Sequence, residues 1–135
     1  MDGVGPVKLR IEELPKLQPD QQSHWSVRHR YRKRWRKKVA DAIYLLDDWR
    51  SHVHRPVPYP YTTKARITAT RHSSSVPDAD NLAISFKTCI DSVVEVLPWI
   101  VSDSPQHCEV TYRHEYAPPK KGYITIEVKT DGDEV

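Results

Sequence analysis

The chain has 135 residues, of which 38% are hydrophobic and 29% charged, and its formal net charge is +3. This length predicts one domain with a small core, which dimerisation would help to stabilise. No stretch approaches the roughly 18 consecutive apolar residues of a membrane span, and the N-terminus lacks the pattern of a signal peptide. Composition therefore argues against a membrane protein and predicts an intracellular, cytoplasmic one. Cys89 and Cys108 occupy apolar positions without metal spacing, which predicts packing as small hydrophobes in a reducing compartment.

The first predicted elements are a strand and a long helix. Val7, Leu9 and Ile11 alternate with polar residues, which indicates a half-buried strand. Residues 27–51 carry apolar side chains at steps of three and four, which predicts a helix with one core-facing stripe. The members of this stripe are Val27, Tyr31, Trp35, Val39, Ala42, Ile43 and Leu46.

The remaining faces of this helix are strongly basic. Eight of the eleven residues from 28 to 38 are Arg or Lys, and acidic residues occur only in the later half. This order opposes the helix dipole, at roughly a few tenths of a kcal/mol for each exposed charge, and like charges four residues apart add to the cost. A polyanionic partner explains the pattern better than helix stability does, although a solvated face or a nuclear-localisation run are alternatives. The predicted DNA contacts are Arg28, Arg30, Arg32, Lys33, Arg34, Arg36, Lys37 and Lys38.

A proline-containing loop at residues 55–61 leads to a second predicted strand at residues 64–70. Residues 71–75 connect this strand to Asp78, and ligands in α/β proteins collect at such strand ends. His72 lies in this connection and is expected to be exposed, with contact to a phosphate as the less favoured alternative.

Three aspartates flank an apolar helical run. In an extended segment, residues two apart point to the same side, so Asp78 and Asp80 converge, and Asp103 follows where the chain can return. Three convergent carboxylates make a hard-oxygen site suited to Mg²⁺. The alternative assigns Asp80 to the N-cap of a helix that starts at Asn81, and the other two aspartates to ordinary turns or loops.

The run itself predicts a second amphipathic helix that ends at Pro98. Its apolar stripe consists of Leu82, Phe86, Cys89, Ile90, Val93 and Leu97. Lys87 and Asp91 lie on another side, where the residues alone favour an ordinary exposed ion pair.

Two further strands are predicted at residues 108–114 and 123–128, joined by a turn that closes them into a hairpin. Lys120 and Lys121 in this turn are candidates for contact with the DNA backbone.

The complete order β-α-β-α-β-β predicts an α+β fold, with a small mixed sheet and two helices packed on it. Residues 1–129 are expected to form a single domain, followed by a disordered acidic tail at 130–135.

Three stretches form a recognisable combination: Asp78-Ala79-Asp80-Asn81-Leu82, Phe86-Lys87-Thr88-Cys89-Ile90-Asp91 and Val101-Ser102-Asp103-Ser104-Pro105. Together they resemble the RusA family of crossover-junction endodeoxyribonucleases. Members of that family carry a D-x-D-N motif, a helical lysine, an aspartate one turn after it and a D-D-[AS] loop. The similarity covers about the central third of the chain, and the order of elements matches over nearly all of it.

The resemblance implies an enzyme that resolves four-way (Holliday) DNA junctions as a homodimer with Mg²⁺, or with Mn²⁺, in recombination and repair. It also implies that the gene is bacterial or phage-encoded. Asp78, Asp80 and Asp103 would be metal ligands with catalytic roles, Lys87 the catalytic lysine, and Asn81 a residue that orients a ligand.

Two positions depart from the family pattern. Ser102 stands where many members have the first aspartate of the loop. Lys87 follows Asp80 by seven residues rather than four, so either its side chain reaches back or the helix starts near Ser85. The alternative functions are a non-catalytic nucleic-acid-binding module and a nuclease that acts on other branched DNA.

Overall fold

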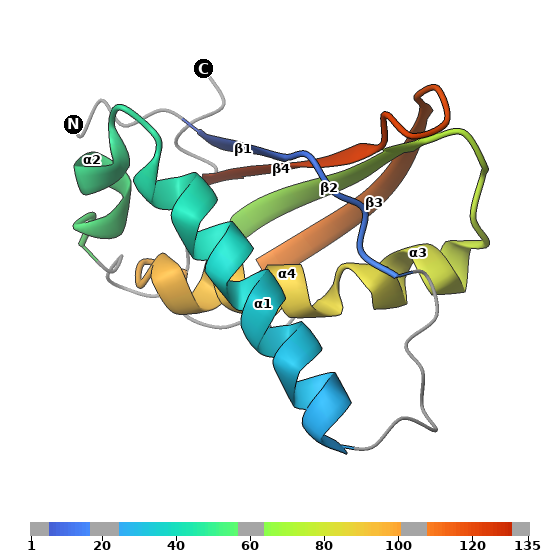
Figure 1. Ribbon diagram of the computed structural model, residues 1–135. Helices are drawn as coiled ribbons and strands as arrows, with labels where there is room; N and C mark the ends of the chain where they lie inside the picture. Colours follow the sequence, from blue (N-terminus) through green and yellow to red (C-terminus); the bar gives the residue numbers. More distant parts are fainter. Residues whose placement is uncertain (1–5, 17–24, 57–63, 101–107, 131–135) are drawn as a thin grey trace.

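In a computed structural model, which describes residues 6–16, 25–56, 64–100 and 108–130, these residues form four strands and four helices (Figure 1). The strands are β1 (Val7–Ile11), β2 (Ala65–Ser73), β3 (Cys108–Tyr116) and β4 (Tyr123–Thr130). The helices are α1 (Trp25–Tyr44), α2 (Trp49–Val53), α3 (Ala79–Ser85) and α4 (Lys87–Val96). The order matches the predicted one, except that each predicted helix is divided into two.

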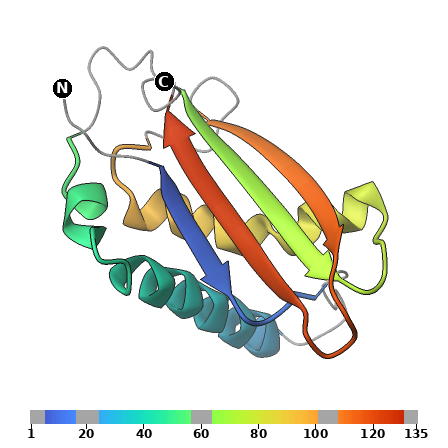
Figure 2. The ribbon, with the colours of Figure 1, turned by 90° about the horizontal axis from the view of Figure 1, so that it is seen from above.

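The described strands form one mixed sheet in the order β1-β4-β2-β3, seen from above in Figure 2. β4 is antiparallel to both β1 and β2, whereas β2 and β3 are parallel. α1 and α4 lie on the same face of this sheet (Figure 1). The predicted α+β class, with a small mixed sheet and helices packed on it, is confirmed.

The predicted hairpin between the last two strands is wrong, because β2 lies between β3 and β4. α3 and α4 carry the chain back along the sheet, so Cys108 at the start of β3 pairs with Ala65 at the start of β2. β4 then returns antiparallel on the other side of β2. The connection between β3 and β4 therefore passes the end of β2, where the Ala117 N–H donates to the Ser73 carbonyl at 3.2 Å.

Three strands extend beyond their predicted ends, and β3 does so by two residues, to Tyr116. β2 is paired on both sides and continues to Ser73, so Arg71, His72 and Ser73 are buried strand residues rather than a connection. His72 is only 8% exposed and stacks on Tyr123 with 4.1 Å between ring centroids, which corrects the expectation of an exposed side chain. Thr130, assigned to the tail, is the buried last residue of β4, and residues 131–135 lie outside the described part of the chain.

The first predicted helix is divided by a turn between α1 and α2. The Leu46 N–H donates to the Ile43 carbonyl at 3.1 Å, a bond over three residues rather than four. Asp47 and Asp48 follow, and carboxylates at a helix C-terminus oppose its dipole. The helix therefore ends before these two aspartates.

The second predicted helix breaks at Phe86 for a reason that the hydrogen bonds make clear. The Ser85 hydroxyl donates to the Leu82 carbonyl at 2.7 Å, and the Phe86 N–H donates to Ala83, one residue short of the usual acceptor. A serine that bonds back to the preceding turn competes with the helical backbone. α3 ends at Ser85 as a result, and α4 starts at Lys87.

The core lies between the sheet and the two helices. Trp35, Val39 and Ile43 of α1 are at most 1% exposed, and the whole predicted stripe of the second helical run is buried. Val27, the first member of the α1 stripe, is 42% exposed and so does not belong to the core. None of the helices in the described ranges is both long and apolar enough to span a bilayer.

Candidate nucleic-acid interface

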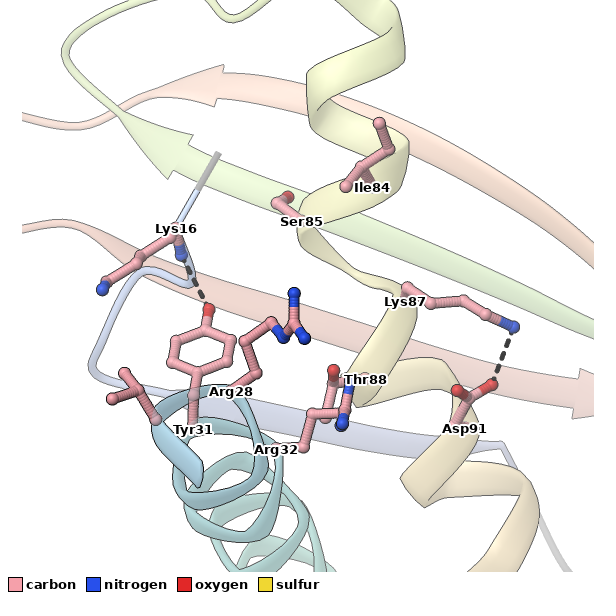
Figure 3. A pocket seen from close by; sticks show the side chains of 10 residues that line it. Lys16, Arg28, Tyr31, Arg32, Ile84, Ser85, Lys87, Thr88 and Asp91 are labelled. Atoms are coloured by element: carbon pink, nitrogen blue, oxygen red, sulfur yellow. Dashed lines mark hydrogen bonds and ion pairs between the residues drawn. The ribbon is translucent and has the colours of Figure 1, made fainter. Parts of the chain in front are cut away.

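A cavity of about 320 Å³ separates the N-terminal turns of α1 from the junction of α3 and α4 (Figure 3). Arg28 and Arg32 line it from α1, and Thr88 and Lys87 line it from α4, with the Lys87 ammonium turned toward Asp91. The described residues that line it are Lys16, Val27, Arg28, Tyr31, Arg32, Ile84, Ser85, Lys87, Thr88 and Asp91. The cavity thus combines two of the predicted DNA contacts with the predicted catalytic lysine, although these residues are far apart in the sequence.

The local fold explains why this cavity stays open. The fully buried residues of α1 begin at Trp35, and Tyr31 packs against the core only in part, so the first turns project beyond the packed part of the helix. After the break at Phe86, the first residues of α4 line the cavity opposite α1. Tyr31 closes one side, and its hydroxyl accepts the Lys16 N–H at 2.9 Å. Partial burial raises the pKa of the Tyr31 hydroxyl, so it remains protonated near neutral pH.

The charges around the cavity are strongly unbalanced. Among the described lining residues, four are cations, Lys16, Arg28, Arg32 and Lys87, and one is a carboxylate, Asp91. An excess of positive charge in a concave, partly apolar site attracts anions and concentrates them there. Sequence reasoning missed Lys16 and Thr88 as lining residues because their positions depend on tertiary packing. Tyr31 did carry a signal, because a tyrosine in an apolar stripe needs a partner for its hydroxyl.

Lys87 occupies the first position of α4 and pairs with Asp91, with 3.1 Å between Nζ and Oδ1. The two side chains are 67% and 43% exposed, and such a surface pair contributes only about 0.3–0.5 kcal/mol. A helix does start at Lys87, close to the predicted alternative of a start near Ser85, but a separate helix, α3, already covers Ala79–Ser85. The other alternative, a Lys87 side chain that reaches back, is not seen, because Lys87 pairs with Asp91 one turn later.

Asp78 and Asp80 lie at the beginning of α3, and both are exposed. Asp78 is the N-cap residue, with extended backbone angles but no hydrogen bond from a side-chain cap. Asp80 belongs to the first helical turn, so neither the extended arrangement of this pair nor the N-cap role of Asp80 is correct. The helix begins earlier than predicted, and Asn81, half-buried, follows inside it.

Asp103 and its neighbour Ser102 lie outside the described residues. Along the sequence, the nearest described residues are Ile100 and Cys108, which lie toward the end of the sheet where β2 begins. Asp78 follows the opposite end of β2. Trp99 marks that first end, since its indole N–H donates to the His52 carbonyl of α2 at 2.9 Å. The convergence of the three predicted ligands therefore stays a prediction.

No group of three or more His, Cys, Asp or Glu side chains within residues 6–16, 25–56, 64–100 and 108–130 is arranged to hold a metal ion. The predicted third ligand is not among those residues. Asp78 and Asp80 make no side-chain hydrogen bond or ion pair with another described residue. Their oxygens are therefore not committed to partners in this part of the protein.

The predicted DNA contacts on α1 fall into two groups. Four of them pair with acidic side chains, and the charge pattern of the helix did not predict these pairs. Arg34 and Lys38 pair with Glu13, Lys37 lies 2.8 Å from Asp41, and Arg36 lies 3.9 Å from Glu95. Arg30, Arg32 and Lys33 make no ion pair with another described residue. The first turn of α1 also contains no acidic residue, as the argument from the helix dipole requires.

Glu13 anchors the basic helix to the end of β1. Its partial burial acts to raise the pKa of the carboxyl, but hydrogen bonds from Lys38 and Arg34 more than offset this, and the pKa is lowered. The carboxylate is therefore charged at neutral pH and holds the middle of α1 in place. This pairing leaves the preceding cations directed toward solvent and toward the cavity.

The cysteines behave as predicted. Cys89 and Cys108 are buried free thiols, and burial raises the pKa of Cys89 to about 12. A thiol with so high a pKa is a packing group rather than a nucleophile or a metal ligand.

Comparison of the sequence with known proteins finds no matching family model and no similar curated protein. The likeness to RusA-type resolvases consequently rests on the quoted motifs alone.

Proposed function

We propose that this protein is a Mg²⁺-dependent endonuclease that resolves four-way DNA junctions, acting as a homodimer. The observation that supports it best is the cavity between α1 and α4, which Arg28, Arg32 and Lys87 all line. Residues assigned from the sequence to DNA contact and to catalysis thus line one cavity.

The cavity suits the phosphodiester backbone. Arg28 and Arg32 lie near the N-terminus of α1, where positive charges oppose the helix dipole and so do not stabilise the helix. Phosphates neutralise such charges and release bound counterions, which provides most of the affinity for nucleic acid. Val27 and Ile84, both partly exposed at the cavity, add an apolar surface beside the cations.

Asp78 and Asp80 fit a hard cation, since both are exposed carboxylates uncommitted to other described residues. Together with Asp103 they would hold Mg²⁺ or Mn²⁺, with Asn81 orienting a carboxylate. Bound there, the cation supplies Lewis-acid chemistry and lowers the pKa of a water. The chain's own contribution is to place these carboxylates at the start of α3, one short helix away from the lysine.

Lys87 would act on the phosphate rather than on the metal. Its ammonium group stands at a helix start, beside the positive end of the α4 dipole, where stability alone disfavours a cation. An incoming phosphate replaces Asp91 as its partner, and the lysine then stabilises the negative charge that develops on the phosphoryl oxygens. A two-fold dimer would present two such sites to the two equivalent strands of a junction.

The test is cleavage of a labelled four-way junction by the wild type and by Asp80→Asn, with Mg²⁺ for activity and Ca²⁺ for binding. We expect cleavage to fall by at least about 10²-fold, while affinity is kept or rises because a negative charge is removed. Asp47→Asn is the matched control, since Asp47 is an exposed aspartate in the turn between α1 and α2. This control should cleave like the wild type.

The second candidate is a nucleic-acid-binding module without catalysis. The Lys87–Asp91 pair favours it, because it gives Lys87 a partner that requires no substrate. A wild type that binds junctions but leaves them intact in Mg²⁺ and Mn²⁺ would establish this candidate. Cleavage of flaps or forks in preference to junctions would instead identify a nuclease of other branched DNA.

A further inference from the structure

Arg71 is a buried cation on the central strand of the sheet. Its side chain points to the face that the helices cover, and the residue is only 7% exposed. Nη1 donates to the Pro15 carbonyl at 2.6 Å, whereas Nε is buried and has no hydrogen-bond partner among the described residues. Burial lowers the pKa of this guanidinium, which still stays charged at neutral pH. A buried charge without an opposite charge is costly, so this one needs an explanation.

The described residues that line the cavity beside Arg71 offer donors and positive charge. Arg71 lines this cavity of about 200 Å³ together with Ser73, Ser74, Ser75 and Lys120. No Asp or Glu is among the described residues that line this cavity. At about 30 Å³ for each water molecule, the volume accommodates a tetrahedral oxyanion with part of its hydration.

The loop between β3 and β4 completes the cavity. Lys120 adopts a left-handed backbone conformation, with φ of 65°, at the tip of this loop. Gly122 lies against Leu14, and a Cβ there would come within 2.4 Å of the Leu14 side chain. The close approach that glycine permits brings the loop, and with it Lys120, against the end of β2.

Ser73 forms part of the cavity wall, and its hydroxyl is not available to bind a ligand. Its hydroxyl donates to the Ser75 carbonyl at 2.8 Å and lies 3.0 Å from His114 Nε2. Ser74 and Ser75 are exposed, and their hydroxyls are therefore accessible to a bound anion. A guanidinium, an ammonium and hydroxyl groups around one concave space are typical of recognition of a phosphate group.

We propose that this cavity, formed by Arg71, the serines at 73–75 and Lys120, is a phosphate-binding site. It is separate from the cavity between α1 and α4 and does not depend on nuclease activity. The phosphate belongs either to a nucleic-acid backbone or to a small phosphate compound, and the chemistry of recognition is the same for both.

The test measures thermal unfolding and isothermal titration with inorganic phosphate, against chloride at equal pH and ionic strength. Phosphate should raise the unfolding temperature of the wild type more than chloride does, by mass action on the folded state. Lys120→Gln should weaken phosphate binding by at least about fivefold. Lys8→Gln is the matched control, since Lys8 is an exposed lysine of β1 that does not line the cavity, and it should bind like the wild type.

Arg71→Met provides a second arm and should abolish the phosphate response. If this variant does not fold, the comparison of phosphate affinity between Lys120→Gln and Lys8→Gln still tests the proposal. The proposal would be overturned if phosphate and chloride shifted the unfolding temperature of the wild type equally. It would also be overturned if the two lysine variants lost phosphate affinity equally.

Repeating the titration with saturating short duplex DNA identifies the source of the phosphate. Loss of phosphate binding indicates the nucleic-acid backbone, and unchanged binding indicates a small phosphate compound.

Discussion

Lys87 is the residue at which structural and functional explanations differ most clearly. Its pair with Asp91 is exposed and of little energetic value, and its place at the start of α4 opposes the helix dipole. A role limited to this ion pair predicts that substituting Lys87 leaves the cleavage rate almost unchanged. A catalytic role predicts a large fall in that rate.

Lys87→Met should reduce the rate of junction cleavage at saturating protein by about 10²–10³-fold. Binding in Ca²⁺ should change far less, and the unfolding temperature should be nearly unaltered. Asp91→Asn is the control, because it removes the same ion pair and leaves the lysine. If both variants lose activity equally, the pair and not the lysine is what matters.

At the level of single residues, sequence periodicity predicted which face of a strand or helix a residue lies on, but not which other elements pack against it. Alternation placed Val7, Leu9 and Ile11 toward the core, and all three are buried. Val27 fits the helical period equally well and is nevertheless 42% exposed, since the fully buried residues of α1 begin only at Trp35. Arg71 was read as part of a connection, because its burial follows from the pairing of β2 on both sides.

At the level of elements, the basic helix was predictable because its charge pattern conflicts with helix stability. The partners of its cations were not, since Glu13 and Glu95 come from other elements. Breaks within helices were also missed. The bond from the Ser85 hydroxyl to the Leu82 carbonyl is a competition between local bonds that apolar periodicity does not report.

The two groups of α1 cations should behave differently toward DNA. Arg32 lines the cavity and has no ion pair among the described residues, whereas Lys37 is held 2.8 Å from Asp41. Arg32→Gln should reduce the slope of log affinity against log salt concentration by about 0.9, as for one lost phosphate contact. Lys37→Gln is the matched control and should change the slope less.

Stability provides an independent check on the same variant. Removing a cation from the N-terminal half of α1 relieves repulsion and the conflict with the dipole, so Arg32→Gln should unfold at an equal or higher temperature. An unaltered salt slope for Arg32→Gln would remove the start of α1 from the proposed interface.

At the scale of the whole molecule, the α+β class followed from the order of elements, but the topology of the last two strands did not. A six-residue connection is compatible with a hairpin, and only the placement of α3 and α4 makes β3 parallel to β2. That placement also sets the two ends of β2 apart, one near the start of α3 and the other beside Cys108. Whether three carboxylates meet is thus a question about tertiary and quaternary structure, which local patterns in the sequence do not answer.

The central claim is that Asp78, Asp80 and Asp103 share a divalent cation, and crystals soaked in Mn²⁺ test it most directly. We predict an anomalous-scattering peak with oxygens of all three carboxylates at about 2.0–2.2 Å, whether residue 103 comes from the same copy or from its partner in a dimer. Mn²⁺ bound elsewhere, or a peak that the carboxylate of residue 103 does not contact in either copy, would contradict the claim.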